Sequence, residues 1–177
     1  MICFVDMEHE KVLRNPSLRP AHFARRLEVK YRFEEISGDV CLIQRFDRVT
    51  PERLREWNAC AVILSGCATD WIEYEPASLA GVRRVIREMD LPILGICGGH
   101  QVVAEALGAT LGPIRELRDG EADPAPHTAP GFFKEWGFTD VQPVAADPIL
   151  EGLGEAPQFM EAHYWEVKEL PASFDVL

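Results

Sequence analysis

A cysteine framed by glycines constrains the fold of this chain more than any other feature of its sequence. Residues 95–101 read Gly-Ile-Cys-Gly-Gly-His-Gln; they follow a short apolar run at 91–94 and precede a helix-like stretch at 102–107. Glycine two positions before Cys97 and two after it, at a strand-to-helix corner, is the thiol form of the G-x-S-x-G nucleophile elbow. The glycines let the strand and the helix approach closely. The motif therefore predicts an α/β sheet with Cys97 at the carboxyl end of one strand.

The same position predicts a reactive thiol. A helix that begins directly after Cys97 presents unpaired N–H groups and a partial positive charge. Both favour the thiolate, because a helix N-terminus lowers the pKa of a cysteine from its usual value of about 8.5. The alternative interpretation is a buried structural cysteine at a strand end, and the paired glycines favour the reactive thiol over it.

Strands and helices alternate along the first part of the chain. Strands are predicted near residues 1–7, 40–43, 60–64 and 91–96, with helices over 19–28, from 50, over 76–89 and after the elbow. This alternation is typical of a three-layer α/β domain with a mostly parallel sheet. Asp6 ends the first strand at the edge where such sheets bind ligands, and we interpret it as a loop-capping carboxylate. Residues 71–74 are interpreted either as a lid or as aromatic core.

The later part of the chain has a different character. Residues 112–131 carry four prolines, which excludes one regular element. Residues 132–138 and 139–144 are predicted to be strands of a hairpin that turns near Gly137. A helical turn is expected at 147–150, and a further strand at 158–162 leads into His163.

Three segments, in their usual order, resemble the class I glutamine amidotransferases. The elbow is similar to the family's G-[IV]-C-x-G-x-Q nucleophile motif. Residues 61–66, Ala-Val-Ile-Leu-Ser-Gly, resemble the strand and turn before its oxyanion loop, and residues 160–171 resemble a segment usually written S-H-x-D-x-V-x-x-L-P. The resemblance covers essentially the whole chain. It implies an α/β/α fold of the flavodoxin-like type, with a mostly parallel central sheet.

The resemblance also implies a glutaminase that supplies ammonia to a synthase, fused or separate. A thiolate attacks the side-chain amide of glutamine, ammonia leaves, and water releases glutamate from a thioester. Cys97 matches the nucleophile, and the backbone N–H groups of Cys67 and Gly98 match the oxyanion donors. The positions that match substrate-binding residues are Gly66, Gln101, Ala162, His163, Tyr164 and Trp165.

Two departures from the family pattern stand out. Cys67 and Ala68 replace the usual Gly-Pro of the oxyanion loop, although any residue except proline supplies a backbone N–H. No His-Pro-Glu or His-x-Glu follows Cys97. We therefore expect residues 1–177 to be a single domain that lacks its last strands and helix and, with them, the catalytic histidine and glutamate. Little or no glutamine turnover is expected from such a chain.

Five histidines are the in-chain alternatives for the missing base. His163 is the main candidate, because it ends a strand, although its surroundings match the substrate-binding segment. His100 lies within the elbow helix, where adjacency in sequence does not aim its ring at the sulfur. The others, His9, His22 and His127, are expected on the solvated surface.

Composition excludes several classes of function. A net charge of −11 argues against a nucleic-acid partner, and the basic pairs Arg25–Arg26 and Arg83–Arg84 are interpreted as solvated helix faces. No run of eighteen apolar residues predicts a membrane span. The five cysteines show neither a C-x-x-C pair nor metal spacing, and the chain has no phosphate-loop motif. No metal or cofactor is therefore expected, and the cytoplasm is the expected compartment.

Other functions remain open beside the glutaminase. A hydrolase of γ-glutamyl compounds uses the same cysteine elbow, and a catalytically silent relative could serve as a binding or regulatory module. An assay with glutamine and γ-glutamyl substrates separates the first two. Labelling of Cys97 without turnover would favour either a fragment of the glutaminase or the silent relative.

Overall fold

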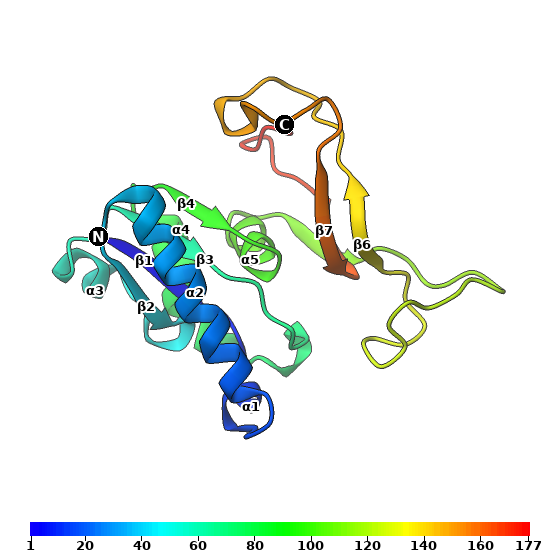
Figure 1. Cartoon of the computed structure of the whole chain (residues 1–177), viewed down its shortest axis with the longest axis horizontal. Helices are drawn as coiled ribbons and strands as arrows, with labels where there is room; N and C mark the ends of the chain where they lie inside the picture. The colour runs from blue at the N-terminus through cyan, green and yellow to red at the C-terminus, as the bar shows by residue number, and fades with distance from the viewer. The chain divides into compact units, whose positions relative to one another are not determined.

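The computed structural model describes residues 1–177 as two compact units, Met1–Leu107 and Gly108–Leu177 (Figure 1). The first unit contains the cysteine elbow. The second contains the segment at 160–171. That residues 1–177 form a single domain remains a prediction.

The first unit is built on a parallel sheet of four strands, in the order β2-β1-β3-β4. These strands are β1 (Ile2–Asp6), β2 (Cys41–Arg45), β3 (Ala61–Leu64) and β4 (Ile93–Gly95). Strand β1 lies in the interior of the sheet, and all of its residues are buried, as expected for a central parallel strand. The predicted parallel α/β sheet is confirmed.

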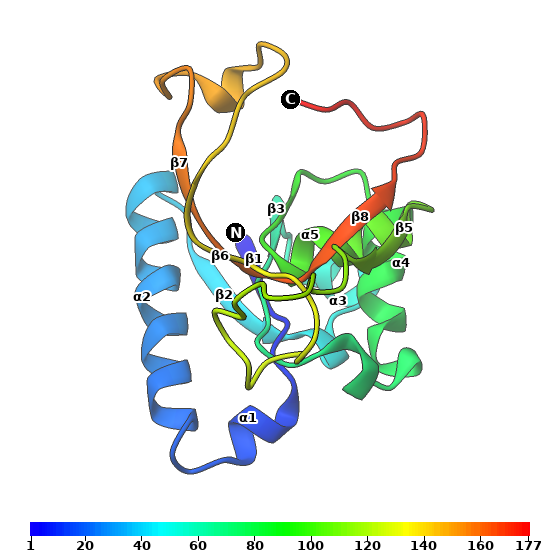
Figure 2. The ribbon, with the colours of Figure 1, turned by 90° about the vertical axis from the view of Figure 1, so that its right-hand side faces the viewer.

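Helices cover both faces of this sheet. Alternate side chains of β1 face opposite ways, so Ile2 and Phe4 pack in one apolar cluster and Cys3 and Val5 in another. The first cluster is closed by Val29 and Phe33 of α2 (Arg19–Ser37). The second contains residues of α3 (Pro51–Glu56), α4 (Ala80–Glu88) and α5 (Gly98–Ala106). Figure 2 shows α2 on one side of the sheet and these three helices on the other.

The elements between the strands differ in places from the prediction. Helix α2 continues past Glu28 to Ser37, where Gly38 ends it in the left-handed conformation with φ 71°. A short helix, α1 (Glu10–Arg14), begins after β1 with His9 as its N-cap. Short 3₁₀ turns lie at η1 (Phe46–Arg48), η2 (Trp71–Glu73) and η3 (Pro76–Leu79). The added helical residues at 29–37 include lysine, arginine and glutamate, which sustain a helix without strong apolar periodicity.

The second unit consists of two antiparallel strand pairs. Strand β5 (Thr110–Pro113) pairs with β8 (Trp165–Glu169), and β6 (Glu135–Asp140) pairs with β7 (Gln158–His163). The predicted hairpin turn near Gly137 is wrong, because β6 runs through this residue and places it opposite Glu161. Glycine tolerates its φ of 118° there, so it does not have to end the strand. A 3₁₀ turn, η4 (Pro148–Leu150), lies between β6 and β7.

No helix of the chain is both long enough and apolar enough to span a bilayer.

Candidate active site

Cys97 occupies a strained position between β4 and α5. Its backbone angles are φ 50° and ψ −112°, in a region that residues with a Cβ seldom adopt. Such strain persists only where the surrounding structure fixes it, and it concentrates at functional sites. The residue is exposed. The alternative of a cysteine buried in the apolar interior therefore does not describe this chain.

Close approach of backbones explains the two framing glycines. A Cβ added to Gly99 would lie 2.2 Å from the carbonyl oxygen of Leu64, at the end of β3. A Cβ added to Gly95 would lie 2.6 Å from the Cα of His100. Both distances are far below a van der Waals contact. The elbow therefore holds the start of α5 directly against the ends of two strands.

The loop at residues 65–69 follows β3 and lies beside Cys97. A Cβ on Gly66 would be 3.2 Å from the Cβ of Cys97, and a Cβ on Gly98 would be 3.4 Å from the backbone nitrogen of Cys67. Neither the Cys67 N–H nor the Gly98 N–H takes part in the backbone hydrogen bonds of the loops and turns. Two amide donors thus lie close to each other and next to Cys97.

Cys67 itself is unsuited to act as a second nucleophile. Burial raises the pKa of its thiol to about 12, and a hydrogen bond with Tyr74 offsets this only in part. The thiol therefore stays protonated at neutral pH. Its backbone nitrogen, in contrast, lies beside the start of α5.

Gln101 lies one turn into α5 and is 6% exposed. Its side-chain oxygen accepts a hydrogen bond of 2.7 Å from the indole N–H of Trp71. Trp71 also packs against the apolar cluster below the sheet, while its neighbour Ile72 is exposed. The segment at 71–74 therefore combines core packing with a contact that orients Gln101.

A buried ionic cluster supports the 65–69 loop. The carboxylate of Asp6 accepts hydrogen bonds from His22 at 2.9 Å and from Arg26 at 3.0 Å. Arg45 lies 3.3 Å from the same carboxylate. Burial acts to raise the pKa of Asp6, but the hydrogen bond from His22 and the charge of Arg26 outweigh it, so the pKa lies below its usual value. Asp6 also accepts from the Glu8 N–H, as expected of a loop-capping carboxylate.

The sequence interpretation missed this cluster. His22 and Arg26 were expected on solvated surface, but their side chains are only 9% and 18% exposed. They are four residues apart on α2 and so share one face of the helix. A histidine and an arginine four residues apart on a helix, together with the acid Asp6 at the end of β1, are the sequence signal that could have identified the cluster.

Glu8 supports the loop from the other end. Its carboxylate accepts hydrogen bonds of 2.8 Å from the Ala68 N–H and from the Thr69 hydroxyl, and the residue is 3% exposed. Substitution of the family's usual proline by Ala68 therefore provides an N–H that the loop uses.

The remaining predicted site residues lie in the second unit. Ala162 and His163 end β7, and Trp165 begins β8. The Tyr164 carbonyl accepts a hydrogen bond of 2.8 Å from the Ile114 N–H. These four residues therefore form the connection between the two antiparallel pairs.

Both ring nitrogens of His163 have partners within this unit. Nδ1 donates to the carbonyl oxygen of Trp165 at 2.9 Å, and Nε2 lies 3.0 Å from a carboxylate oxygen of Glu135 and of Glu161. The three side chains share one face of β6 and β7. They could also hold a metal ion, since their ligand atoms lie within 4.8 Å of one another. The contacts of Nε2 with both carboxylates account for their grouping without one.

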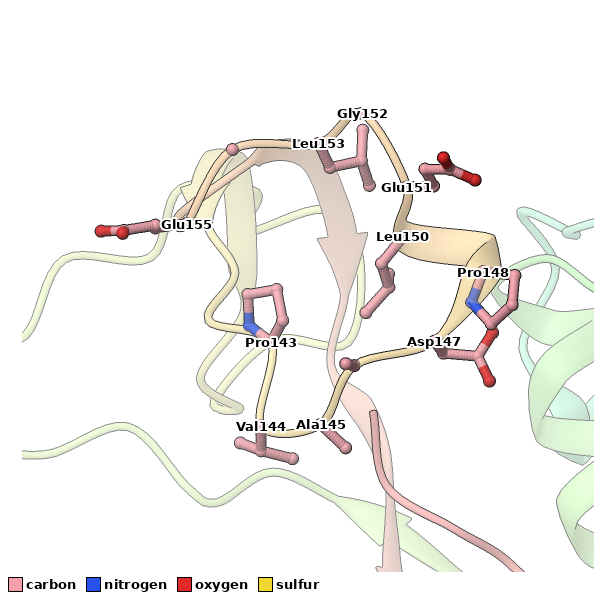
Figure 3. Close-up of a pocket in the computed structure, with 12 residues that line it drawn as sticks. Pro143, Val144, Ala145, Asp147, Pro148, Leu150, Glu151, Gly152, Leu153 and Glu155 are labelled. Atoms are coloured by element: carbon pink, nitrogen blue, oxygen red, sulfur yellow. The ribbon is translucent and has the colours of Figure 1, made fainter.

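An open hollow lies within the loop at 143–155 of the second unit (Figure 3). Its lining includes Pro143, Val144 and Leu150, together with Glu151 and Glu155, whose carboxylates point away from the hollow in Figure 3. No thiol, hydroxyl or imidazole side chain lines it, and the Asp147 carboxylate caps η4. The surroundings of Cys97, rather than this hollow, are therefore the candidate active site.

Known proteins resemble the chain in sequence. It is 31% identical over 144 residues to a GMP synthase [glutamine-hydrolyzing] of Phenylobacterium zucineum, a match that covers 80% of this chain and 24% of that protein. It is 31% identical over 90 residues to anthranilate synthase component 2 of Methanocaldococcus jannaschii, covering 50% of this chain and 43% of that protein. The chain thus spans less than half the length of these relatives.

Solved structures resemble it in fold. The structure of a putative GMP synthase subunit from Thermoplasma acidophilum matches 97% of this chain and 69% of its own, with a TM-score of 0.59 and 23% identity. A glutamine amido transferase of Methylobacillus flagellatus matches 96% of this chain and 57% of its own, with a TM-score of 0.62 and 18% identity.

The family model "Glutamine amidotransferase class-I" matches residues 35–177, which include the cysteine elbow, the 65–69 loop and the 160–171 segment. The chain belongs to the class I glutamine amidotransferase family.

Proposed function

We propose that this chain binds glutamine and attacks its side-chain amide with the Cys97 thiolate. The observation that carries the proposal is the strained, exposed elbow cysteine with the Cys67 and Gly98 amides beside it. Attack on the amide carbon moves negative charge onto the carbonyl oxygen. Two preorganised N–H groups stabilise that charge, and one such donor is typically worth about 10²–10³ in rate.

Two further steps complete the reaction. The tetrahedral adduct expels ammonia, which takes up the proton that the Cys97 thiol lost on becoming a thiolate, and a thioester of glutamate on Cys97 remains. Water then hydrolyses the thioester and regenerates the thiol. Gly66 and Gln101 are proposed to bind the substrate near its amide, and residues 162–165 to bind its amino-acid end.

The ammonia is proposed to serve a synthase. GMP synthases and an anthranilate synthase component are similar to this chain, which favours a partner that is a synthase domain or a separate synthase chain. The acceptor of the ammonia follows from the identity of that partner. We propose a cytoplasmic location, as expected for a chain rich in unpaired cysteines.

Alkylation by a glutamine analogue tests the proposal. The chloro ketone 2-amino-4-oxo-5-chloropentanoate carries the amino-acid end of glutamine, and a thiolate displaces its chloride to form a thioether. We expect one label on Cys97 by mass spectrometry, slowed by added glutamine and absent from Cys97→Ser. Labelling that glutamine does not slow would contradict the proposal.

Ammonia release from glutamine tests the catalytic step. Because both ring nitrogens of His163 already have partners, this chain alone is expected to alkylate much faster than it turns over. Brisk release that is lost in His163→Gln would instead establish His163 as the base. Cleavage of γ-glutamyl-p-nitroanilide in preference to glutamine would indicate the γ-glutamyl hydrolase alternative.

A further inference from the structure

We propose that Arg26, anchored by the buried carboxylate of Asp6, is a positioning residue that fixes the peptide between Gly66 and Cys67 so that its N–H faces the reacting oxygen. The inference rests on the proposed attack by Cys97. It assigns a role to a side chain that does not itself contact the substrate.

The carbonyl oxygen of Gly66 is held by two donors. A guanidinium N–H of Arg26 donates to it at 3.2 Å, and the Ser65 hydroxyl donates to it at 2.9 Å. The Ser65 hydroxyl is itself oriented, because its oxygen accepts from the Met7 N–H at 2.9 Å. The direction of this carbonyl is therefore set by Arg26 of α2 and by Ser65, which directly follows β3.

Fixing this carbonyl fixes the Cys67 amide. The Gly66 C=O and the Cys67 N–H belong to one planar peptide, and no peptide bond in the chain is cis. In a trans peptide the two groups point in opposite directions. The Cys67 N–H therefore points away from Arg26 and Ser65, and the Gly98 backbone lies on the nucleophile side, close to the Cys67 nitrogen.

Arginine suits this role because its planar fork can make two directed contacts at once. Its Nε donates to one oxygen of Asp6 at 3.0 Å, while its Nη2 reaches the Gly66 carbonyl. His22 and Arg45 hold the other oxygen of Asp6. The end of β1 is thus connected to the Gly66–Cys67 peptide through the planar guanidinium of one side chain.

Rates of alkylation test the proposal without requiring turnover. Iodoacetamide reports access to the Cys97 thiolate. The chloro ketone is in addition attacked at its ketone carbon, which puts negative charge on the carbonyl oxygen before the adduct collapses to the thioether and releases chloride. Arg26→Lys keeps the charge beside Asp6 but cannot make both contacts. We expect its maximal rate of chloro ketone labelling to fall about tenfold or more, since an oxyanion donor is typically worth about 10²–10³. The half-saturating concentration and the iodoacetamide rate should not change.

The matched control is Arg25→Lys, which makes the same substitution at the exposed neighbour on the same helix. Its ratio of chloro ketone rate to iodoacetamide rate should equal that of the wild type. An unchanged ratio in Arg26→Lys would overturn the positioning role and leave the proposed function intact. Absence of glutamine-sensitive labelling in the wild type would overturn both. Equal melting temperatures of the two variants would exclude a loss of fold as the cause.

Discussion

The two units of the chain are stabilised by different interactions. Met1–Leu107 buries an apolar cluster on each face of its sheet, whereas Ala125 is the only buried apolar residue from Gly108–Leu177. The second unit instead relies on strand pairing and on ion pairs such as Lys134 with Asp123. Close packing tolerates little displacement, while polar contacts rearrange at lower cost. Cys97 and the two backbone amides beside it thus lie in the part of the molecule that packing holds most firmly.

Removal of a core side chain should produce the largest difference between the units. Leu54 of α3 is 0% exposed in the larger cluster, and Leu54→Ala should cost about 2–5 kcal/mol of unfolding free energy. The matched variant Leu153→Ala removes a side chain that is 44% exposed in the second unit, and its cost should stay within about 0.5 kcal/mol. Denaturant unfolding measures both. Equal costs would show that the second unit has a core of its own.

A buried lysine should be the corresponding weak point of the second unit. Lys134 donates to both oxygens of Asp123 and to the Phe132 carbonyl, and its side chain is 1% exposed. Lys134→Met leaves these acceptors without their donor and should cost about 1.5–3 kcal/mol. Lys168→Met, at a side chain that is 34% exposed, should cost about 0–1 kcal/mol. Hydrogen exchange of peptides from 108–177 should detect the first variant and not the second.

A glycine pair compares the packing of the two units directly. Gly99→Ala places a methyl group 2.2 Å from the Leu64 carbonyl and should cost about 1–3 kcal/mol, with loss of labelling at Cys97. Gly154→Ala, in the second unit, meets nothing within 4 Å and should leave stability nearly unchanged. Thermal unfolding compares the two. A neutral Gly99→Ala would mean that β3 and α5 are less closely packed than described.

Acid should weaken the contacts of Asp6 with His22, Arg26 and Arg45. We expect the resulting loss of unfolding free energy to be the smallest of the four effects. The pKa of Asp6 is lower in the folded chain than in the unfolded one. The contribution of the Asp6 carboxylate to folding stability is therefore present above its unfolded pKa of about 3.9. It is lost as the pH falls through the pKa that Asp6 has in the folded chain. Asp6→Asn should be less stable than the wild type at neutral pH, and the difference should shrink toward pH ~3. A difference that does not depend on pH would mean that Asp6 acts only by its shape.

Local patterns predicted the elements around the elbow because each requirement there is carried by adjacent residues. Apolar runs gave the parallel strands, and the spacing of Gly95, Cys97 and Gly99 gave the corner. The Arg26 contact was not predicted, because an arginine on a helix is usually solvated and its burial depends on which strand end it meets. The pairing of β6 with β7 likewise depends on residues that are far apart in sequence. Glycine at position 137 gave a misleading turn signal.

The strained backbone of Cys97 lowers the stability of the chain at the same residue that exposes a thiol. The mirror image of its φ and ψ lies in the extended region, so glycine would adopt this conformation without strain. For a residue with a Cβ, this backbone conformation lowers the folding stability by on the order of 1–3 kcal/mol. Replacement of Cys97 by glycine should therefore relieve this strain and raise the melting temperature of the chain, while it removes the sulfur.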